Sequence, residues 1–285
     1  MGLVYKTYTR SVRNTILIMI PELSASKVAG FIGLHKYQNP DEIFYELLGR
    51  DTVGKKKIAE LHKEFNLQPY SKVLNEILRD PAVKDCIACG VSAANRTADV
   101  VSVLEDVQHQ AGAVLALRHD TLPEELRARV ADEIRGQVSK QRGLQNEEKI
   151  LNTYEAAREV KVVERNTKMV KKDCGNYKLV GRCDGYVAEK NRIVDSKDRT
   201  REWPTVPLYD EIQLRAYMRM YDAAESELIE RFPNKTERHT LFTNDDDKWK
   251  HIHDLIERGV ARLNLALQDE GELKRIVFAN TVKVE

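Results

Sequence analysis

Two short β-rich segments separated by a polar turn constrain the fold of this chain more than any other feature. The first spans residues 177–187, the turn spans 189–191, and the second spans 192–197. This pattern predicts an antiparallel hairpin. Because successive side chains of a strand point to opposite faces, Asp195 and Lys197 are expected to leave the second strand on the same side.

This acid and amine, together with Asp184 on the first strand, have the chemistry required for metal-assisted cleavage of a phosphodiester. Carboxylates from two strands can hold Mg²⁺, which polarises a phosphoryl oxygen and lowers the pKa of a bound water. A neighbouring lysine can orient or deprotonate the attacking water, or stabilise the transition state. The alternative is an exposed hairpin whose Asp195 and Lys197 form a surface ion pair of little energetic value.

Two predicted helices flank the hairpin in the sequence. Segment 142–158 is helical by composition and apolar spacing, and this prediction places Glu147 in the first turn. Segment 209–221 is a second helix, in which Gln213 and Tyr217 stand four residues apart. Each residue also has a structural interpretation, because an acid suits a helix N-terminus and the other two fit a buried amide and a core-edge aromatic.

Taken in order, these segments resemble the PD-(D/E)XK nuclease superfamily and, within it, the lambda-exonuclease-like or YqaJ-type viral recombinase group. That order is a helix with Gly-x-x-x-Glu, a strand with Asp-Gly, a strand with (Asp/Glu)-x-Lys, and a helix with Gln and often Tyr. The matching residues are Gly143 and Glu147, Asp184 and Gly185, Asp195 to Lys197, and Gln213 with Tyr217. The resemblance covers roughly residues 22–48 and 142–221.

The resemblance implies an α/β fold with a restriction-endonuclease-like core, in which helices flank a central mixed β-sheet. It also implies Glu147, Asp184 and Asp195 as ligands of Mg²⁺ or Mn²⁺, with the Ser196 carbonyl as a further ligand. Lys197 would be the catalytic lysine. The remaining members of the predicted catalytic group are Gln213 and Tyr217.

Segment 23–37 resembles the amino-terminal signature of the same group. Ser24 is predicted to be an N-cap, and Ser26 lies at a helix start whose free N–H groups suit a phosphate. The alternative is that both serines merely cap a packed helix. In lambda-type enzymes this region helps bind a terminal 5′-phosphate, which makes Ser26 the candidate. The arginine that those enzymes place before the serine is absent from the apolar run 16–20, and Arg13 or Arg182 could substitute for it.

Charge is distributed unevenly along a chain whose formal net charge is only +1. Residues 158–201 contain 13 Lys and Arg against 7 Asp and Glu, whereas residues 222–257 contain 10 acids against 5 bases. A basic region around the site would attract phosphate groups, although a solvated face of mixed sign is the alternative. The predicted phosphate contacts, which would bring position without sequence specificity, are Lys168, Lys171, Lys172, Arg182, Arg199 and Arg201.

The 285 residues are enough for one large domain or for a core with a helical accessory part. We expect residues 1–70 to form the N-terminal helical part of the nuclease domain, 71–141 a helical insertion or cap, and 142–285 the nuclease core with a C-terminal helix. Residues 1–21 are expected to form an irregular or strand-bearing arm. The acidic turn 243–247 is expected to cap a helix over 247–268.

The four cysteines allow a metal hypothesis. Cys86 and Cys89 have the spacing of a zinc or redox motif, and Cys174 and Cys183 could complete a four-thiolate site. Reduced thiols in an intracellular protein are the default expectation. The apolar run 16–20 is too short to span a bilayer, so we expect a protein of the cytoplasm or nucleus of a host cell, without a membrane partner.

The sequence therefore predicts a Mg²⁺-dependent DNA nuclease, specifically a 5′-to-3′ exonuclease acting on the ends of duplex DNA. The group that it resembles often forms a ring-shaped homotrimer and works with a single-strand annealing protein in recombination, and the same partners are expected here. The first alternative is an endonuclease of the same superfamily, of the repair, restriction or resolving type. The second is a noncatalytic nucleic-acid-binding protein that kept the fold.

Overall fold

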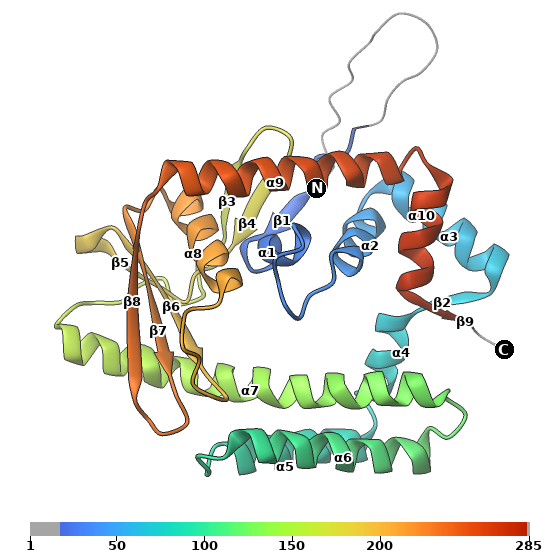
Figure 1. Cartoon of the computed structure of the whole chain (residues 1–285), viewed down its shortest axis with the longest axis horizontal. Helices are drawn as coiled ribbons and strands as arrows, with labels where there is room; N and C mark the ends of the chain where they lie inside the picture. Colours follow the sequence, from blue (N-terminus) through green and yellow to red (C-terminus); the bar gives the residue numbers. More distant parts are fainter. Residues whose placement is uncertain (1–17, 284–285) are drawn as a thin grey trace, which may run out of the picture.

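The structure, a computed structural model that describes residues 18–283, contains a four-stranded mixed sheet with strand order β5–β6–β7–β8. Strand β5 (Gly185–Val187) pairs antiparallel with β6 (Arg192–Asp198), which confirms the predicted hairpin. Strand β6 is parallel to β7 (Glu225–Arg231), and β8 (Glu237–Thr243) pairs antiparallel with β7. The predicted mixed α/β architecture is therefore confirmed (Figure 1).

Two helices cover the two faces of this sheet. Val194 and Ile229 pack with residues of α7 (Glu124–Arg158), whereas Ile193 and Leu228 belong to the larger hydrophobic cluster that contains α8 (Leu208–Tyr221). Alternation along β6 therefore sends one set of side chains to α7 and the other to α8. Helix α8 also supplies the crossover that the parallel pairing of β6 and β7 requires.

A second sheet brings the N-terminal segment next to the hairpin. Strand β1 (Glu22–Ser24) is parallel to β4 (Lys178–Gly181), which pairs antiparallel with β3 (Val170–Asp173). The predicted strand over 177–187 is therefore divided between two sheets, because β4 ends at Gly181 and β5 begins only at Gly185. A Cβ at Gly185 would lie 2.2 Å from the Val162 Cγ1 atom, so only glycine allows the chain to pass here.

The remaining helices around the main core are short or capped by polar side chains. Asn39 and Asp245 each accept a hydrogen bond from a backbone N–H at a helix start, which confirms the acidic turn as a cap. No helix between residues 18 and 283 combines the length and apolar character needed to cross a membrane. The helices and short strands not yet described are η1 (Ala25–Lys27), α1 (Val28–Phe31), α2 (Pro40–Arg50), α3 (Thr52–Phe65), β2 (Leu67–Pro69), η2 (Ala188–Lys190), α9 (Asp246–Ala266), α10 (Glu270–Ala279) and β9 (Thr281–Lys283).

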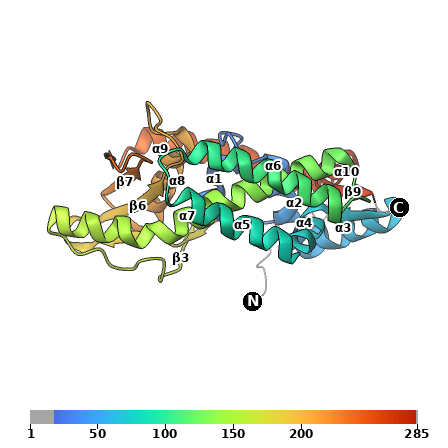
Figure 2. The same cartoon turned by 90° about the horizontal axis from the view of Figure 1, so that it is seen from below.

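A separate hydrophobic cluster lies among α4 (Tyr70–Ile77), α5 (Pro81–Ala94), α6 (Val100–Arg118) and the first part of α7 (Figure 2). Pro81 begins α5 and Pro123 precedes α7. No break occurs at residues 141–142, however, because α7 continues from the cluster to the sheet. Glu147 therefore lies well inside α7, and its predicted place in a first helical turn is wrong.

Strand β7 belongs to the main sheet, but the sequence pattern did not predict it. Its glutamates make it look like part of an acidic, solvent-exposed segment, yet Glu227 is 4% exposed and Glu230 is 0% exposed. Arginines from neighbouring elements neutralise them: Arg192 pairs with Glu227, and both Arg199 and Arg238 pair with Glu230. These ion pairs thus offset the charges of the buried glutamates, while Leu228 and Ile229 pack in the hydrophobic clusters on the two faces of the sheet.

We expect Glu230→Gln to lower the free energy of unfolding by about 3 to 5 kcal/mol, because Arg199 and Arg238 would lose their shared buried partner. Urea unfolding followed by circular dichroism measures the change. Glu202→Gln, on the exposed loop before α8, is the matched control and should change stability by less than about 0.5 kcal/mol. Equal effects of the two substitutions would contradict the structural role of Glu230.

Candidate active site

The predicted acid and lysine meet on the face of β6 that α8 covers. The Nζ atom of Lys197 lies 2.6 Å from Oδ2 of Asp195. Asp195 is only 1% exposed, and the Lys197 side chain is 26% exposed. A buried carboxylate with a lysine that reaches toward solvent is not a surface ion pair, so the exposed-hairpin alternative is excluded.

Asp184 approaches β6 from the break between the two sheets. Its Oδ2 atom accepts hydrogen bonds from the Ser196 backbone N–H at 2.9 Å and from the Ser196 hydroxyl at 3.3 Å. The last backbone pair of β5 and β6 joins Gly185 to Val194. The Asp184 side chain therefore continues this pairing beyond the end of β5, and the break in the strand is what frees it to do so.

Glu147 reaches the same site from α7. Its carboxylate accepts a hydrogen bond from the side chain of Asn166 and interacts electrostatically with Asp195 and Lys197. A Cβ at Gly143, one helical turn earlier, would meet no atom within 4 Å. The glycine of the Gly-x-x-x-Glu pattern thus leaves open space beside Glu147, where a ligand could approach the helix backbone.

Helix α8 supplies the polar side chains opposite β6. Gln213 Nε2 donates a hydrogen bond to Asp195 Oδ1 at 3.2 Å. Tyr217, four residues later and on the same helical face, is buried against Gly181, where a Cβ would come within 3.1 Å of its ring. Burial, reinforced by the charges of Asp195 and Asp184, raises the pKa of the Tyr217 hydroxyl, so it stays protonated.

Electrostatics distinguish these acids from ordinary buried ones. Burial raises the pKa of Asp195 to about 7, and Asp184 adds to this rise while Lys197 opposes it. Burial likewise raises the pKa values of Asp184 and Glu147. Burial alone would lower the pKa of Lys197, but Asp195, Asp184 and Asp210 together raise it above its ordinary value. When Asp195, Asp184 and Asp210 are all ionised, their negative charge exceeds the single positive charge of Lys197.

A divalent cation that prefers oxygen ligands fits the chemistry of this donor set, because it would offset the excess charge. Within residues 18–283, no three Asp, Glu, His or Cys side chains converge closely enough to hold a metal ion in their present positions. In this structure protein donors engage two of the carboxylates: Lys197 and Gln213 bind Asp195, and Ser196 binds Asp184. Metal binding would exchange these contacts for the cation.

The sequence patterns did not predict the residues that join α7 to β6 by hydrogen bonds. The Asp198 side chain is 0% exposed and accepts hydrogen bonds from Asn146 Nδ2 at 2.7 Å and Arg142 at 3.2 Å. Alternation along β6 places Asp198 on the α7 face, and Arg142 and Asn146 are four residues apart on α7. These periodicities were visible in the sequence, but the pairing between strand and helix was not. The contact positions the helix that carries Glu147.

Asp210 is a second residue that the sequence analysis missed. It is 3% exposed, accepts a hydrogen bond from Arg199 NH2 at 2.7 Å, and contributes to the electrostatics of Lys197. Its position three residues before Gln213 places both near one face of α8. Arg199, which the sequence analysis predicted to contact phosphate, is 9% exposed and also pairs with Glu230. That prediction is wrong, because the Arg199 guanidinium is buried and pairs with Asp210 and Glu230.

The other predicted phosphate contacts divide into paired and unpaired cations. Each of three exposed or half-buried lysines has an acid partner: Lys168 pairs with Glu164, Lys171 with Glu22, and Lys172 with Asp222. Arg182 and Arg201 are exposed, and in the part of the chain that the structure describes neither forms an ion pair. Acids thus offset three of these lysines, and the partners of Lys171 and Lys172 lie far away in the sequence.

The two N-terminal serines lie beside β4, and no contact joins them to the carboxylates in the described structure. Ser24 precedes the short helix η1 but makes no side-chain capping bond, so the predicted side-chain cap is wrong. Its hydroxyl instead lies 3.0 Å from that of the exposed Ser26. Ala25 packs near Gly181 and Tyr217. Ser26 remains a predicted phosphate contact, and Arg13 lies outside the described residues.

The cysteines do not assemble into a metal site within the described range. Cys86 and Cys89 lie on α5 in the separate helical cluster, whereas Cys174 and Cys183 lie by the sheet that contains β3 and β4. All four are free thiols. The four-thiolate alternative therefore finds no support, because two different hydrophobic cores separate the pairs.

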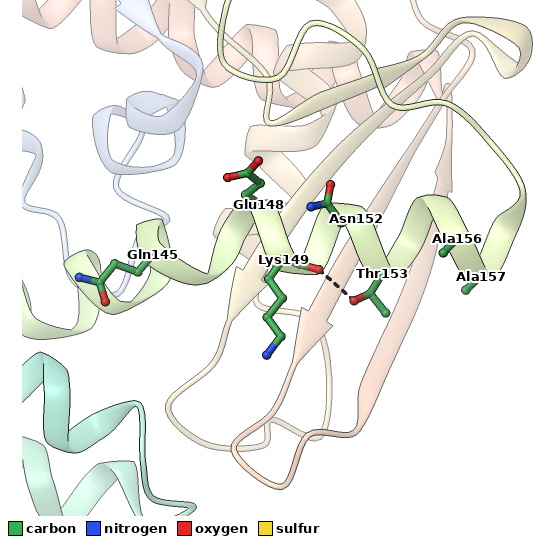
Figure 3. A pocket seen from close by; sticks show the side chains of 7 residues that line it. All are labelled: Gln145, Glu148, Lys149, Asn152, Thr153, Ala156 and Ala157. Atoms are coloured by element: carbon green, nitrogen blue, oxygen red, sulfur yellow. Dashed lines mark hydrogen bonds between the residues drawn. The ribbon is translucent and has the colours of Figure 1, made fainter.

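A shallow, wide-open groove of about 820 Å³ follows the outer side of α7 (Figure 3). None of the predicted site residues lines it, although Glu148 stands next to Glu147 in the sequence. The groove is therefore distinct from the carboxylate–lysine site. Its lining residues are Gln145, Glu148, Lys149, Asn152, Thr153, Ala156 and Ala157.

We expect Lys197 to react slowly with an amine-selective acylating reagent at pH 8, because only the unprotonated amine reacts and three acids raise its pKa. Asp195→Asn removes the nearest acid, so labelling of Lys197 should become faster, by about tenfold for each unit by which the pKa falls. Mass spectrometry of peptides measures the rates in the presence of EDTA. Lys190, on the exposed turn of the hairpin, is the internal control, and an unchanged Lys197 rate relative to it would contradict the pairing.

No family model matches the chain, and no curated protein matches it in sequence. Its structure is similar to that of an alkaline exonuclease from Laribacter hongkongensis, with 15% identity, a TM-score of 0.40, and coverage of 48% of this chain and 73% of that one. The complex of that enzyme with dAMP is similar at a TM-score of 0.38, 15% identity, and coverage of 48% and 72%. A phage-related exonuclease from Haemophilus somnus is similar at a TM-score of 0.38, 14% identity, and coverage of 46% and 72%.

Proposed function

We propose that this protein is a metal-dependent nuclease that hydrolyses phosphodiester bonds of DNA. The observation that carries the proposal is the convergence of Glu147, Asp184 and Asp195 around Lys197, between α7, β6 and α8. Acids that are buried close together, with pKa values above the ordinary range, are typical of catalytic sites rather than of structural ion pairs. The intact acid–lysine set also argues against a binding protein that has lost its activity.

The three carboxylates would hold Mg²⁺ or Mn²⁺, with the Ser196 carbonyl as a further candidate ligand. When bound, such a cation lowers the pKa of a coordinated water and offsets the charge of the phosphate. Lys197 is protonated at neutral pH, because the surrounding acids raise its pKa. It therefore serves as a cation that orients and stabilises the phosphate rather than as a base. Gln213 positions Asp195 through its hydrogen bond.

For the mode of attack, we propose a 5′-to-3′ exonuclease that acts on duplex ends. The support is the motif order of the sequence, including the segment that contains Ser24 and Ser26, which would bind a terminal phosphate. Arg182 and Arg201 are the exposed cations available to the DNA backbone. A homotrimer and a single-strand annealing partner belong to the same proposal, on the resemblance alone. An endonuclease would use the same carboxylate–lysine site but would not require a DNA end.

We expect the protein with Mg²⁺ to degrade linear duplex DNA that carries a 5′-phosphate and to leave closed circular DNA intact. EDTA should abolish the activity, and Lys197→Ala should lower the rate by at least about 100-fold, because the phosphate loses its cation. Lys190→Ala, on the exposed turn of the same hairpin, is the matched control and should keep full activity. Gel analysis of the products checks each result.

Cleavage of the circular DNA in that experiment would identify an endonuclease instead. Inactivity on both DNA forms, repeated with Mn²⁺ and with RNA, would contradict catalysis and favour the noncatalytic binding protein. Equal loss of activity in Lys197→Ala and Lys190→Ala would show that the effect does not come from the site. These outcomes therefore show separately whether the protein cleaves DNA and whether cleavage requires a DNA end.

Metal binding should be visible without substrate, as a rise in the melting temperature on addition of Mn²⁺ or Mg²⁺. The pKa of Asp195 is about 7 in the folded chain and 3.8 ordinarily, so the folded state binds more protons between these pH values. Without metal, this carboxylate therefore lowers stability as pH rises through that window. Protons compete with the cation at low pH, so the metal-induced shift should be larger at pH 8 than at pH 6.

Differential scanning fluorimetry measures this shift. Asp184→Asn and Asp195→Asn should each lose it, whereas Asp106→Asn, an exposed substitution on α6, should keep it. A shift that is equal at the two pH values, or that survives both site substitutions, would place the cation elsewhere on the protein.

A further inference from the structure

Three aromatic side chains from two separate segments pack together beside the carboxylate–lysine site, and Lys36 lies between them and a fourth ring, that of Trp203. His35 and Tyr37 lie in the segment between α1 and α2, Trp203 lies in the loop between β6 and α8, and Tyr209 lies in the first turn of α8. We name these four residues the aromatic platform. Their neighbourhood arises only in the folded chain, because more than 160 residues separate the first pair from the second.

Three rings of the platform pack against one another in tilted and edge-on arrangements. The ring centroids of His35 and Tyr209 are 4.3 Å apart with an interplanar angle of 32°, and Tyr37 stands edge-on at 6.3 Å from Tyr209. Tyr37 is 62% exposed. Rings that served only to anchor a loop would be expected to bury their faces. The exposed Tyr37, next to three partly exposed rings, retains surface on which a flat group can stack.

Two cations accompany the rings. The Lys36 Nζ atom lies 5.4 Å from the centroid of Tyr37 and 5.7 Å from that of Trp203, and the Arg201 guanidinium lies 4.2 Å from the centroid of Trp203. Both residues are exposed, and neither forms an ion pair with any residue from 18 to 283. Lys171 and Lys172 of β3 differ from them, because each pairs with an acid. Lys36 and Arg201 therefore remain available to an anion.

The platform is continuous with the site along α8. Tyr209, Gln213 and Tyr217 are spaced four residues apart and share one face of the helix, so Tyr209 stands about 6 Å along the axis from Gln213. Gln213 contacts Asp195 directly. Tyr209 and His35 both interact electrostatically with Asp210, which acts on Lys197 as well. A strand whose phosphate reached Lys197 would therefore place a neighbouring nucleotide next to the platform.

Exposed aromatic faces interleaved with unpaired cations are the combination that binds single-stranded nucleic acid. The rings stack on bases of any sequence, and the cations contact the phosphates between them. Base faces are accessible only where a base is unpaired and has left its own stack. An apolar protein partner would leave Lys36 and Arg201 desolvated without a counter-charge, so a polyanion with flat groups fits this surface better.

We propose that the aromatic platform stacks unpaired bases of the DNA strand that enters the carboxylate–lysine site, while Lys36 and Arg201 contact the phosphates of that strand. This inference rests on the proposed nuclease function and adds a base-binding subsite to it. The subsite is independent of base identity, because the rings read no hydrogen-bonding edge.

The two tryptophans of the chain allow a direct test. Trp249→Phe, on α9, leaves Trp203 as the single tryptophan, and EDTA prevents cleavage of an added oligonucleotide. A 5′-phosphorylated oligothymidine should quench the Trp203 fluorescence, whereas an abasic oligonucleotide with the same number of phosphates should not. Trp203→Phe, which retains only Trp249, is the matched control and should show no quenching by either oligonucleotide.

Affinity provides the second measurement, by fluorescence anisotropy of labelled oligonucleotides. Tyr37→Ala and Trp203→Ala should each weaken binding of the oligothymidine by about 5- to 100-fold and leave binding of the abasic strand unchanged. Lys36→Ala and Arg201→Ala should weaken both strands alike and reduce the dependence on salt. Equal affinity of the wild-type protein for the two strands, or unchanged oligothymidine binding in both aromatic variants, would overturn the proposal.

Failure of the subsite and failure of the nuclease function give different results. Cleavage of linear DNA without any preference for bases over abasic sites would overturn the platform and leave the nuclease in place. Quenching and a preference for bases, without cleavage under any metal condition, would support the platform and remove the catalytic function. If both hold, Tyr37→Ala and Trp203→Ala should raise KM for linear DNA more than they lower kcat, because they remove strand binding rather than the carboxylate–lysine chemistry.

Discussion

The parallel pairing of β6 with β7 is the constraint on which the rest of the structure depends. Seven consecutive pairs join the two strands, from Arg192 with Glu225 to Asp198 with Arg231. Parallel neighbours need a long crossover, and here that crossover contains α8. Because α8 packs back on one face of the sheet, it is brought over Asp195, while α7 covers the opposite face. The site is thus a consequence of how the sheet is connected.

Buried acids serve two different purposes in this protein, and their pKa values tell them apart. Burial alone would raise the pKa of Glu227 on β7, but the nearby His239 and hydrogen bonds from Tyr154 and Arg192 lower the pKa to about 2. It is a structural acid whose charge these partners offset. Asp195, one strand away, has a pKa raised to about 7 despite its lysine. The difference marks a site where charge is left uncompensated, which is where a cation or a phosphate ligand would contribute most.

Much of the candidate site could be predicted from local patterns. The alternation that places Asp195 and Lys197 together, and the four-residue spacing of Gln213 and Tyr217, follow from strand and helix geometry alone. The predictions failed where distant residues decided the outcome. Arg199 looked like a surface cation, but β7 and α8 supply two acids that bury it. Strand β7 itself was missed, because its glutamates find partners only in the folded sheet.

The sequence by itself determined the hairpin and the side of β6 on which the acid and the lysine stand, because backbone periodicity sets these features locally. Only the tertiary structure decided that the strand breaks at Asp184 and that α7 runs unbroken past Glu147. It also decided which cations are neutralised and which, like Arg201, stay available beside exposed rings. The physical reason is that ion pairing and ring stacking act between residues close in space, and sequence separation carries no information about that distance.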